Sequence, residues 1–167
     1  MSLELLEAPV DGVDPLDLIE HVAVSLDLDC ERVDDTELHL VTKGAWRDTG
    51  IWFTWRPELS TLQLGAPLDL KVPEGRMADA FRLVGQVNER LWVGHYDLWS
   101  EDQSLVYRNA AILPENGYLD PQQAEILIKA TSEAVERFFP AFNFLIWGEK
   151  SPEDALQSAM FETRGSA

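Results

Sequence analysis

The chain has 167 residues, of which 46% are hydrophobic, so we expect one folded domain with one core rather than a disordered or fibrous chain. Thirteen basic against 30 acidic residues give a formal net charge of -17, which repels the phosphates of nucleic acids and of anionic lipids. Neither nucleic acid nor membrane is therefore expected as a partner. The single cysteine, Cys30, leaves no internal disulfide and no multi-cysteine zinc site, and it fits a reducing compartment.

The first half of the chain predicts a helix followed by three strands. Residues 1–13 show no clear period and lack the basic start and long apolar run of a signal peptide, so we expect a loose lead-in and a cytoplasmic protein. Asp14-Pro15 is typical of a helix start, and apolar residues at helical spacing predict a helix to about Leu28. Alternating apolar residues then predict strands over 36–42, 46–56 and 62–72.

The next part of the chain predicts a helix and two strands. Pro73 opens a helix whose apolar stripe ends before Gly94. Alternation returns after this glycine. It predicts one strand over 95–100 and a second strand that begins at Leu105 and ends before Pro114.

The C-terminal part is predicted to be helical. Asp120-Pro121 repeats the helix-start pattern, and this third helix reaches Pro140. That proline should kink or interrupt the helix, because it lacks an N–H and its ring collides with the preceding turn. Residues 142–147 are too apolar for a linker, so we expect them in a core or an interface. A capping box at Ser151 then opens a short last helix, and residues 163–167 are expected to be a tail.

The order of these elements predicts a fold class. Helix, three strands, helix, two strands, helix and a short C-terminal helix make an α+β two-layer domain over residues 14–162. Its sheet is expected to be antiparallel and five-stranded, with the helices on one face.

One predicted strand is apolar on both of its faces, because Trp52 lies between Ile51 and Phe53 in its alternation. One helical layer covers only one face of a sheet. We therefore expect a homodimer that buries the other face together with the aromatic residues after Pro140. The alternative is that the segment after Pro140 folds back and covers that face within one chain.

Candidate chemistry is sparse. His95 and Asp97 lie two apart on a predicted strand and therefore share a face, so the carboxylate could orient the imidazole as a general base. No serine or cysteine nucleophile in a recognisable motif accompanies them, and a hydrogen-bonded sheet histidine is the favoured interpretation. His21 and His39 have no second ligand at metal spacing. We expect no catalytic residue, no cofactor and no metal site.

Six tryptophans are many for this length. Core packing is the favoured interpretation for them overall, and the alternative is that some line a surface that binds another protein. The residues proposed for that surface are Trp52, Trp55, Trp99, Phe142 and Trp147.

Several segments together point to a known family. They are Asn88-x-x-Leu91-Trp92-Val93-Gly94-His95-Tyr96-Asp97-Leu98-Trp99-Ser100, Tyr107-Arg108, Phe139-Pro140-Ala141-Phe142, Trp147-Gly148 and Ala155 to Glu162. In this pattern the chain resembles the YbjN family of bacterial sensory transduction regulators, from about residue 14 to 162.

The resemblance implies a fold like that of type III secretion chaperones, whose members bind extended segments of partner proteins and often dimerise. It carries no catalytic residues. The function expected is that of a non-enzymatic regulatory or chaperone-like protein that binds a protein partner of unknown identity. The alternatives are a small enzyme that uses His95 and Asp97, and a structural subunit of a larger assembly.

Overall fold

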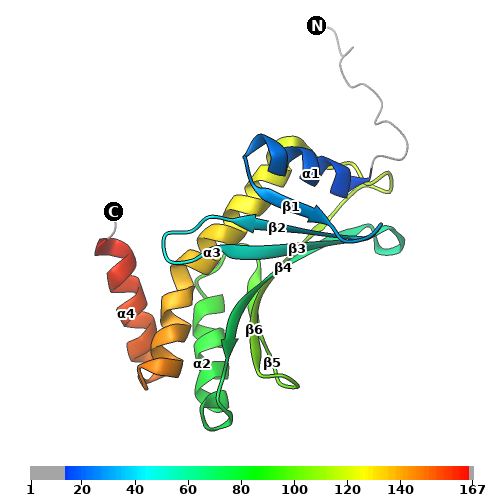
Figure 1. The fold of residues 1–167 in the computed structure, drawn as a ribbon. Coiled ribbons are helices and arrows are strands. Elements are labelled where there is room, and N and C mark those ends of the chain that lie inside the picture. Colours follow the sequence, from blue (N-terminus) through cyan, green and yellow to red (C-terminus); the bar gives the residue numbers. More distant parts are fainter. Residues whose placement is uncertain (1–13, 166–167) are drawn as a thin grey trace, which may run out of the picture.

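The computed structural model describes residues 14–165, with side chains as far as Phe161, so the expected lead-in over 1–13 lies outside the described residues. The chain forms helices and strands in the order shown in Figure 1. They are α1 (Pro15–Ser25), β1 (Asp29–Arg32), β2 (Glu37–Thr42), β3 (Thr49–Arg56), β4 (Thr61–Lys71), α2 (Met77–Asn88), β5 (His95–Trp99), β6 (Ser104–Ile112), α3 (Pro121–Trp147) and α4 (Pro152–Gly165), with short 3-10 turns at Pro57–Leu59 and Glu74–Arg76.

The strands form one antiparallel sheet in the order β1-β2-β3-β4-β6-β5, which confirms the predicted α+β class. The sheet has six strands where five were predicted, and the predicted first helix is three residues too long. The chain leaves α1 at Ser25, turns through Asp27 at φ 57°, and forms β1 at the edge of the sheet. An edge strand of sequence Asp-Cys-Glu-Arg buries little apolar surface, so it lacks the alternation that marks its neighbours.

The described helices all lie on one side of the sheet, which we call the helical face (Figure 1). Helices α1 and α3 pack on each other and on the sheet, α2 packs on β5 and α3, and α4 packs on α3 and α2. The core lies between the layers, where Tyr96 contacts the rings of Tyr107, Phe138 and Phe142 at centroid distances of 5.1–6.3 Å. The buried Tyr96 hydroxyl donates to the Ala134 carbonyl at 2.8 Å, and burial raises the pKa of Tyr96 well above its ordinary value.

Helix α3 continues without interruption through Pro140, so of the predicted kink or interruption the interruption is wrong. Proline removes one hydrogen bond from the helix, but burial of Phe142, Leu145 and Ile146 just beyond it holds the last turns in place. These residues pack into the core on the helical face. The segment after Pro140 therefore does not fold back over the opposite face of the sheet.

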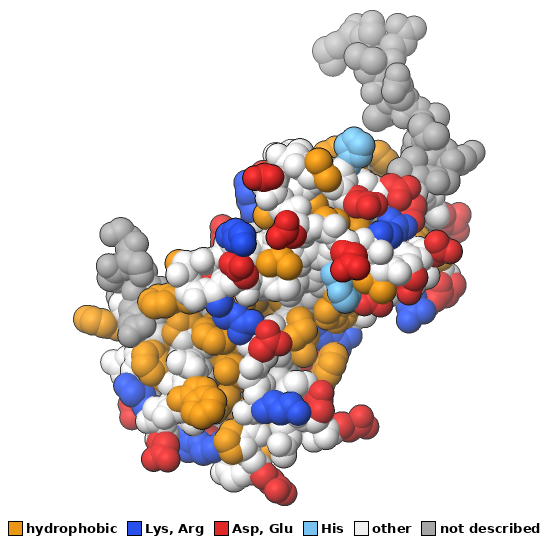
Figure 2. Space-filling model, viewed as in Figure 1, with side chains coloured by type: hydrophobic (Ala, Val, Ile, Leu, Met, Phe, Trp, Pro, Cys, Tyr) orange, Lys and Arg blue, Asp and Glu red, His pale blue; other side chains and the backbone are white. Residues whose placement is uncertain are grey.

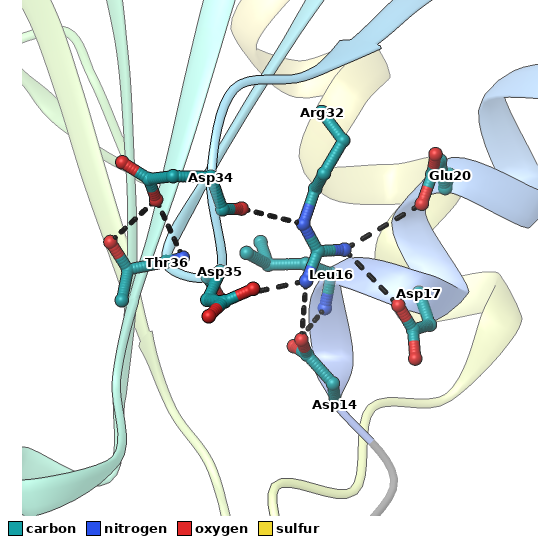
Figure 3. Close-up of polar contacts among 8 residues, drawn as sticks. All are labelled: Asp14, Leu16, Asp17, Glu20, Arg32, Asp34, Asp35 and Thr36. Atoms are coloured by element: carbon teal, nitrogen blue, oxygen red, sulfur yellow. Dashed lines mark hydrogen bonds and ion pairs between the residues drawn. The ribbon is translucent and has the colours of Figure 1, made fainter.

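Arg32 links α1 to the hairpin of β1 and β2 through ion pairs and hydrogen bonds (Figure 3). Its guanidinium lies 2.5 Å from the Asp14 carboxylate, 3.1 Å from Asp17 and 3.6 Å from Glu20, and its Nε donates to the Asp34 carbonyl at 2.9 Å. Burial lowers the pKa of Arg32, but hydrogen bonds and attraction from Asp14 and Asp17 outweigh it and hold the pKa above its ordinary value. The carboxylates of Asp17 and Glu20 on α1 and of its N-cap residue Asp14 thus share one cation.

Candidate functional site

The face of the sheet opposite the helices is formed by the side chains that alternate with the core residues, and we call it the open face. The register places six residues in one row across it, one from each strand, in the order Glu31, His39, Trp52, Gly65, Arg108 and His95. Alternation with the core is clear on β2 and β3, where His39, for example, lies between the fully buried Leu38 and Leu40. The row therefore runs across the whole sheet, over roughly 24 Å at the usual strand spacing.

Trp52 occupies the centre of this row and lies across Gly65 on the neighbouring strand. A Cβ built on Gly65 would come within 2.3 Å of the indole ring, so only glycine lets the ring lie this close to the sheet. Gly50 lies two residues before Trp52, and a Cβ there would meet nothing within 4 Å. Gly65 therefore lets the indole ring lie close to the backbone of β4, and Gly50 leaves open space on the other side of Trp52.

A shallow hollow of about 240 Å³ opens beside Trp52, on the side of Gly50. Its lining residues come from three neighbouring strands and are His39, Leu40, Val41, Gly50, Ile51, Trp52, Pro67 and Asp69. The Asp69 carboxylate at its rim is held by Arg47 Nη2 at 2.7 Å, and His39 Nε2 lies 2.6 Å from the Glu37 carboxylate. The hollow thus combines largely apolar walls with one lining carboxylate, Asp69, that Arg47 already pairs.

At the other end of the row, Asp97 lies between two basic side chains. Its Oδ2 lies 2.9 Å from Arg108 Nη1 and 3.3 Å from His95 Nε2. The structure therefore brings His95 and Asp97 together, as the enzyme alternative requires. Asp97 uses the same oxygen for both neighbours, however, and Arg108 is the closer one, so the carboxylate is engaged in an ion pair as well as beside the imidazole. The His95 side chain is half exposed.

The outer edge of β5 is partly closed by a side chain of α2. The Asn88 carboxamide accepts from the Tyr96 N–H at 2.8 Å and donates to the Tyr96 carbonyl at 3.1 Å, as a neighbouring strand would. An incoming strand would have to displace this pair before it could add to the sheet here. Binding to this half of the sheet is therefore easier over the open face than along its edge.

The structure separates the residues that were expected to form one binding surface. Trp52 and Trp99 share the open face, and Trp99 is 41% exposed on the edge strand β5. Trp55 and Phe142 belong to the core, at 8% and 0% exposure, so neither side chain is free to meet a partner. Trp147 is exposed, but it lies at the end of α3 on the helical side.

Other residues of the open face carried a weaker signal in the sequence. Gly65 lies on the face of β4 opposite that of Leu62, Leu64 and Ala66. A glycine inside a strand often marks a position where another group comes close to the backbone. Pro67 and Asp69 follow it on the same face, where the register shifts between Pro67 and Lys71. Their meeting with His39 depends on strand order, which local periodicity does not contain.

The described residues 14–165 give little evidence of a metal site or of a reactive thiol. Within that range no group of three or more His, Cys, Asp or Glu side chains is arranged to hold a metal ion. Burial raises the pKa of the Cys30 thiol, which makes its reactive thiolate scarcer at neutral pH. The helices of the described part also include none with the length and apolar character of a membrane span.

Fold and site together define a two-layer α+β protein in which the described residues 14–165 cover one face of the sheet and leave the other open. The chain belongs to the YbjN family: the family model, described as "Putative bacterial sensory transduction regulator", matches residues 15–144. No curated protein matches the sequence.

A solved structure supports the shared fold. The crystal structure of YbjN from E. coli, described as "a putative transcription regulator", is 14% identical in sequence with a TM-score of 0.50. The match covers 72% of this chain and 85% of that one. Both descriptions are those of regulators rather than of enzymes.

Proposed function

We propose that this protein is a non-enzymatic, cytoplasmic regulatory or chaperone-like protein that binds a segment of another protein on the open face of its sheet. The observation that carries the proposal is the hollow beside Trp52, on a sheet face that the described helices leave uncovered. Tryptophan is enriched among the residues that dominate protein-protein binding, because it offers a large, stiff apolar surface.

The chemistry of the hollow indicates what kind of segment fits. Its apolar walls would take one aliphatic or aromatic side chain, and the negative net charge of the protein favours a segment that also carries lysine or arginine. The net charge of -17 would attract such a segment from a distance. The mode of binding agrees with that expected from a type III secretion chaperone-like fold.

The test is differential capture from the native host. Wild type, Trp52→Gln and Trp92→Gln would be immobilised, and the proteins retained by each would be quantified by mass spectrometry. Trp92 is the matched control because it is fully exposed and lies outside the sheet, in the turn between α2 and β5. We expect proteins that wild type and Trp92→Gln retain equally and that Trp52→Gln depletes at least tenfold, since losing a central aromatic anchor costs about 2 kcal/mol or more.

Equal retention by Trp52→Gln and wild type would count against binding at the open face. Depletion by both variants alike would show a general loss of aromatic surface rather than a defined site.

A further inference from the structure

A second exposed surface lies on the helical side of the molecule, at the hairpin of α3 and α4. Figure 2 shows hydrophobic side chains gathered over the region where α2, α3 and α4 lie in Figure 1. On α4, the side chains at spacings of three, four and seven from Asp154 are Gln157, Ser158 and Phe161, which form one stripe. The opposite stripe of α4 is buried, so this one faces outward.

This stripe and α3 enclose a hollow of about 540 Å³, lined by Phe144, Lys150, Asp154, Gln157, Ser158 and Phe161. Phe161 is 79% exposed, and Trp147, one turn beyond Phe144 on α3, is 74% exposed. Aromatic side chains bury about 150–250 Å² each, so these three rings offer on the order of 400 Å² of exposed surface. That is about half of what each partner contributes to an ordinary stable interface.

The charges of the hollow are balanced but not paired with each other. The Lys150 ammonium lies 5.0 Å from the centre of the Phe144 ring and donates to Ser158 Oγ at 2.9 Å. Among the described residues, Lys150 makes no ion pair, and neither does Asp154. In a molecule of charge -17, this is an aromatic surface whose lining residues carry one positive and one negative charge.

We infer that a second copy of this chain covers the hollow, in a two-fold contact between the two α3–α4 hairpins. A two-fold contact brings the same surface of both copies together, so it requires a surface that complements itself. Lys150 of one copy would face Asp154 of the other, twice about the axis, while Phe161 and Trp147 fill the space between them. Over the acidic remainder of the surface, two copies repel each other.

The inferred contact is independent of the proposed binding on the open face, and it refines the expected homodimer by assigning it to another surface. Apart from Phe144, the residues that line the hollow lie beyond residue 144, where the family match ends. The modest aromatic area predicts a dimer that dissociates on dilution.

Light scattering over a concentration series, at about 150 mM salt, tests the inference with charge reversals. Wild type should approach twice 18.9 kDa as concentration rises. Lys150→Asp and Asp154→Lys each place like charges opposite each other and should weaken dimerisation at least tenfold. The double variant Lys150→Asp/Asp154→Lys restores the pairing with reversed sign and should return to within about threefold of wild type.

Two further variants separate this surface from the open face. Phe161→Glu should abolish the dimer without unfolding the monomer, because the side chain is exposed, and Trp52→Gln should leave the dimer unchanged. A mass that stays at 18.9 kDa at every concentration would overturn the inference. So would a dimer that Phe161→Glu and both charge reversals leave intact, or one that Trp52→Gln alone dissociates.

Discussion

Gly65 shows how one residue sets the shape of the open face. Its missing side chain is what allows the Trp52 indole to lie flat on the sheet, since a Cβ would meet ring atoms at 2.3 and 2.5 Å. We expect Gly65→Ala to displace the ring and to lower the free energy of unfolding by about 1–3 kcal/mol, as overpacking does. Urea denaturation measures this loss, and partner capture by the variant should fall with it.

Gly50→Ala is the matched control on the same face. A Cβ at Gly50 meets nothing within 4 Å, so alanine should leave stability unchanged or raise it by about 0.5 kcal/mol through the lower entropy of the unfolded chain. Equal destabilisation by the two substitutions would mean that the loss comes from strand backbone rather than from Trp52.

Among the elements, α1 is held on the sheet at its N-terminal end by buried Pro15 and Leu16 and by the ion pairs of Arg32. Arg32 on β1 binds Asp14 and Asp17 of that end while its side chain remains 25% exposed. Arg32→Met keeps the apolar part of the side chain but leaves the carboxylates facing one another. We expect it to lower the free energy of unfolding by about 1–3 kcal/mol, as losses of partly buried charged hydrogen bonds do. Thermal and urea unfolding measure the change.

The control for Arg32 is Arg56→Met on β3. Arg56 is exposed and makes no ion pair with any residue in the described range, so its loss should change stability by less than about 0.5 kcal/mol. If both substitutions cost the same, the stabilisation would come from overall charge rather than from the Arg32 contacts. A second expectation concerns the turn between β1 and β2, whose local structure should be retained in Arg32→Met. Hydrogen bonds from Thr36 lower the pKa of Asp34 in that turn, and they should survive in Arg32→Met.

At the scale of the whole molecule, the net charge limits which macromolecules the protein can bind. The solved relative is described as a transcription regulator, yet this chain carries -17, which opposes the approach of DNA. We expect no detectable binding to duplex DNA at about 150 mM salt in fluorescence anisotropy. Micromolar affinity that weakens steeply with added salt would contradict this expectation. If no DNA binding is detected, as we expect, a regulatory role would act through proteins rather than through direct contact with DNA.

The sequence alone predicted the elements whose residues repeat with a clear period. The alternation of Leu62, Leu64 and Ala66 predicted β4, and Asp120-Pro121 predicted the start of α3. The order of these elements then predicted the α+β class with helices on one face. Local hydrophobic periodicity and capping were sufficient here because they act between residues that are near each other in the chain.

Tertiary structure decided what such periodicity does not contain. Edge strand β1 buries too little to show a pattern, and the buried residues beyond Pro140 hold α3 together despite the proline. Alternation in the sequence placed Trp52 and Trp55 on opposite faces of one strand, but it did not show that the helices cover the face of Trp55 and leave that of Trp52 open. The hollow beside Trp52 exists only because strand order brings His39 of β2 and Pro67 of β4 to the two sides of β3, and strand order depends on packing between residues far apart in the chain.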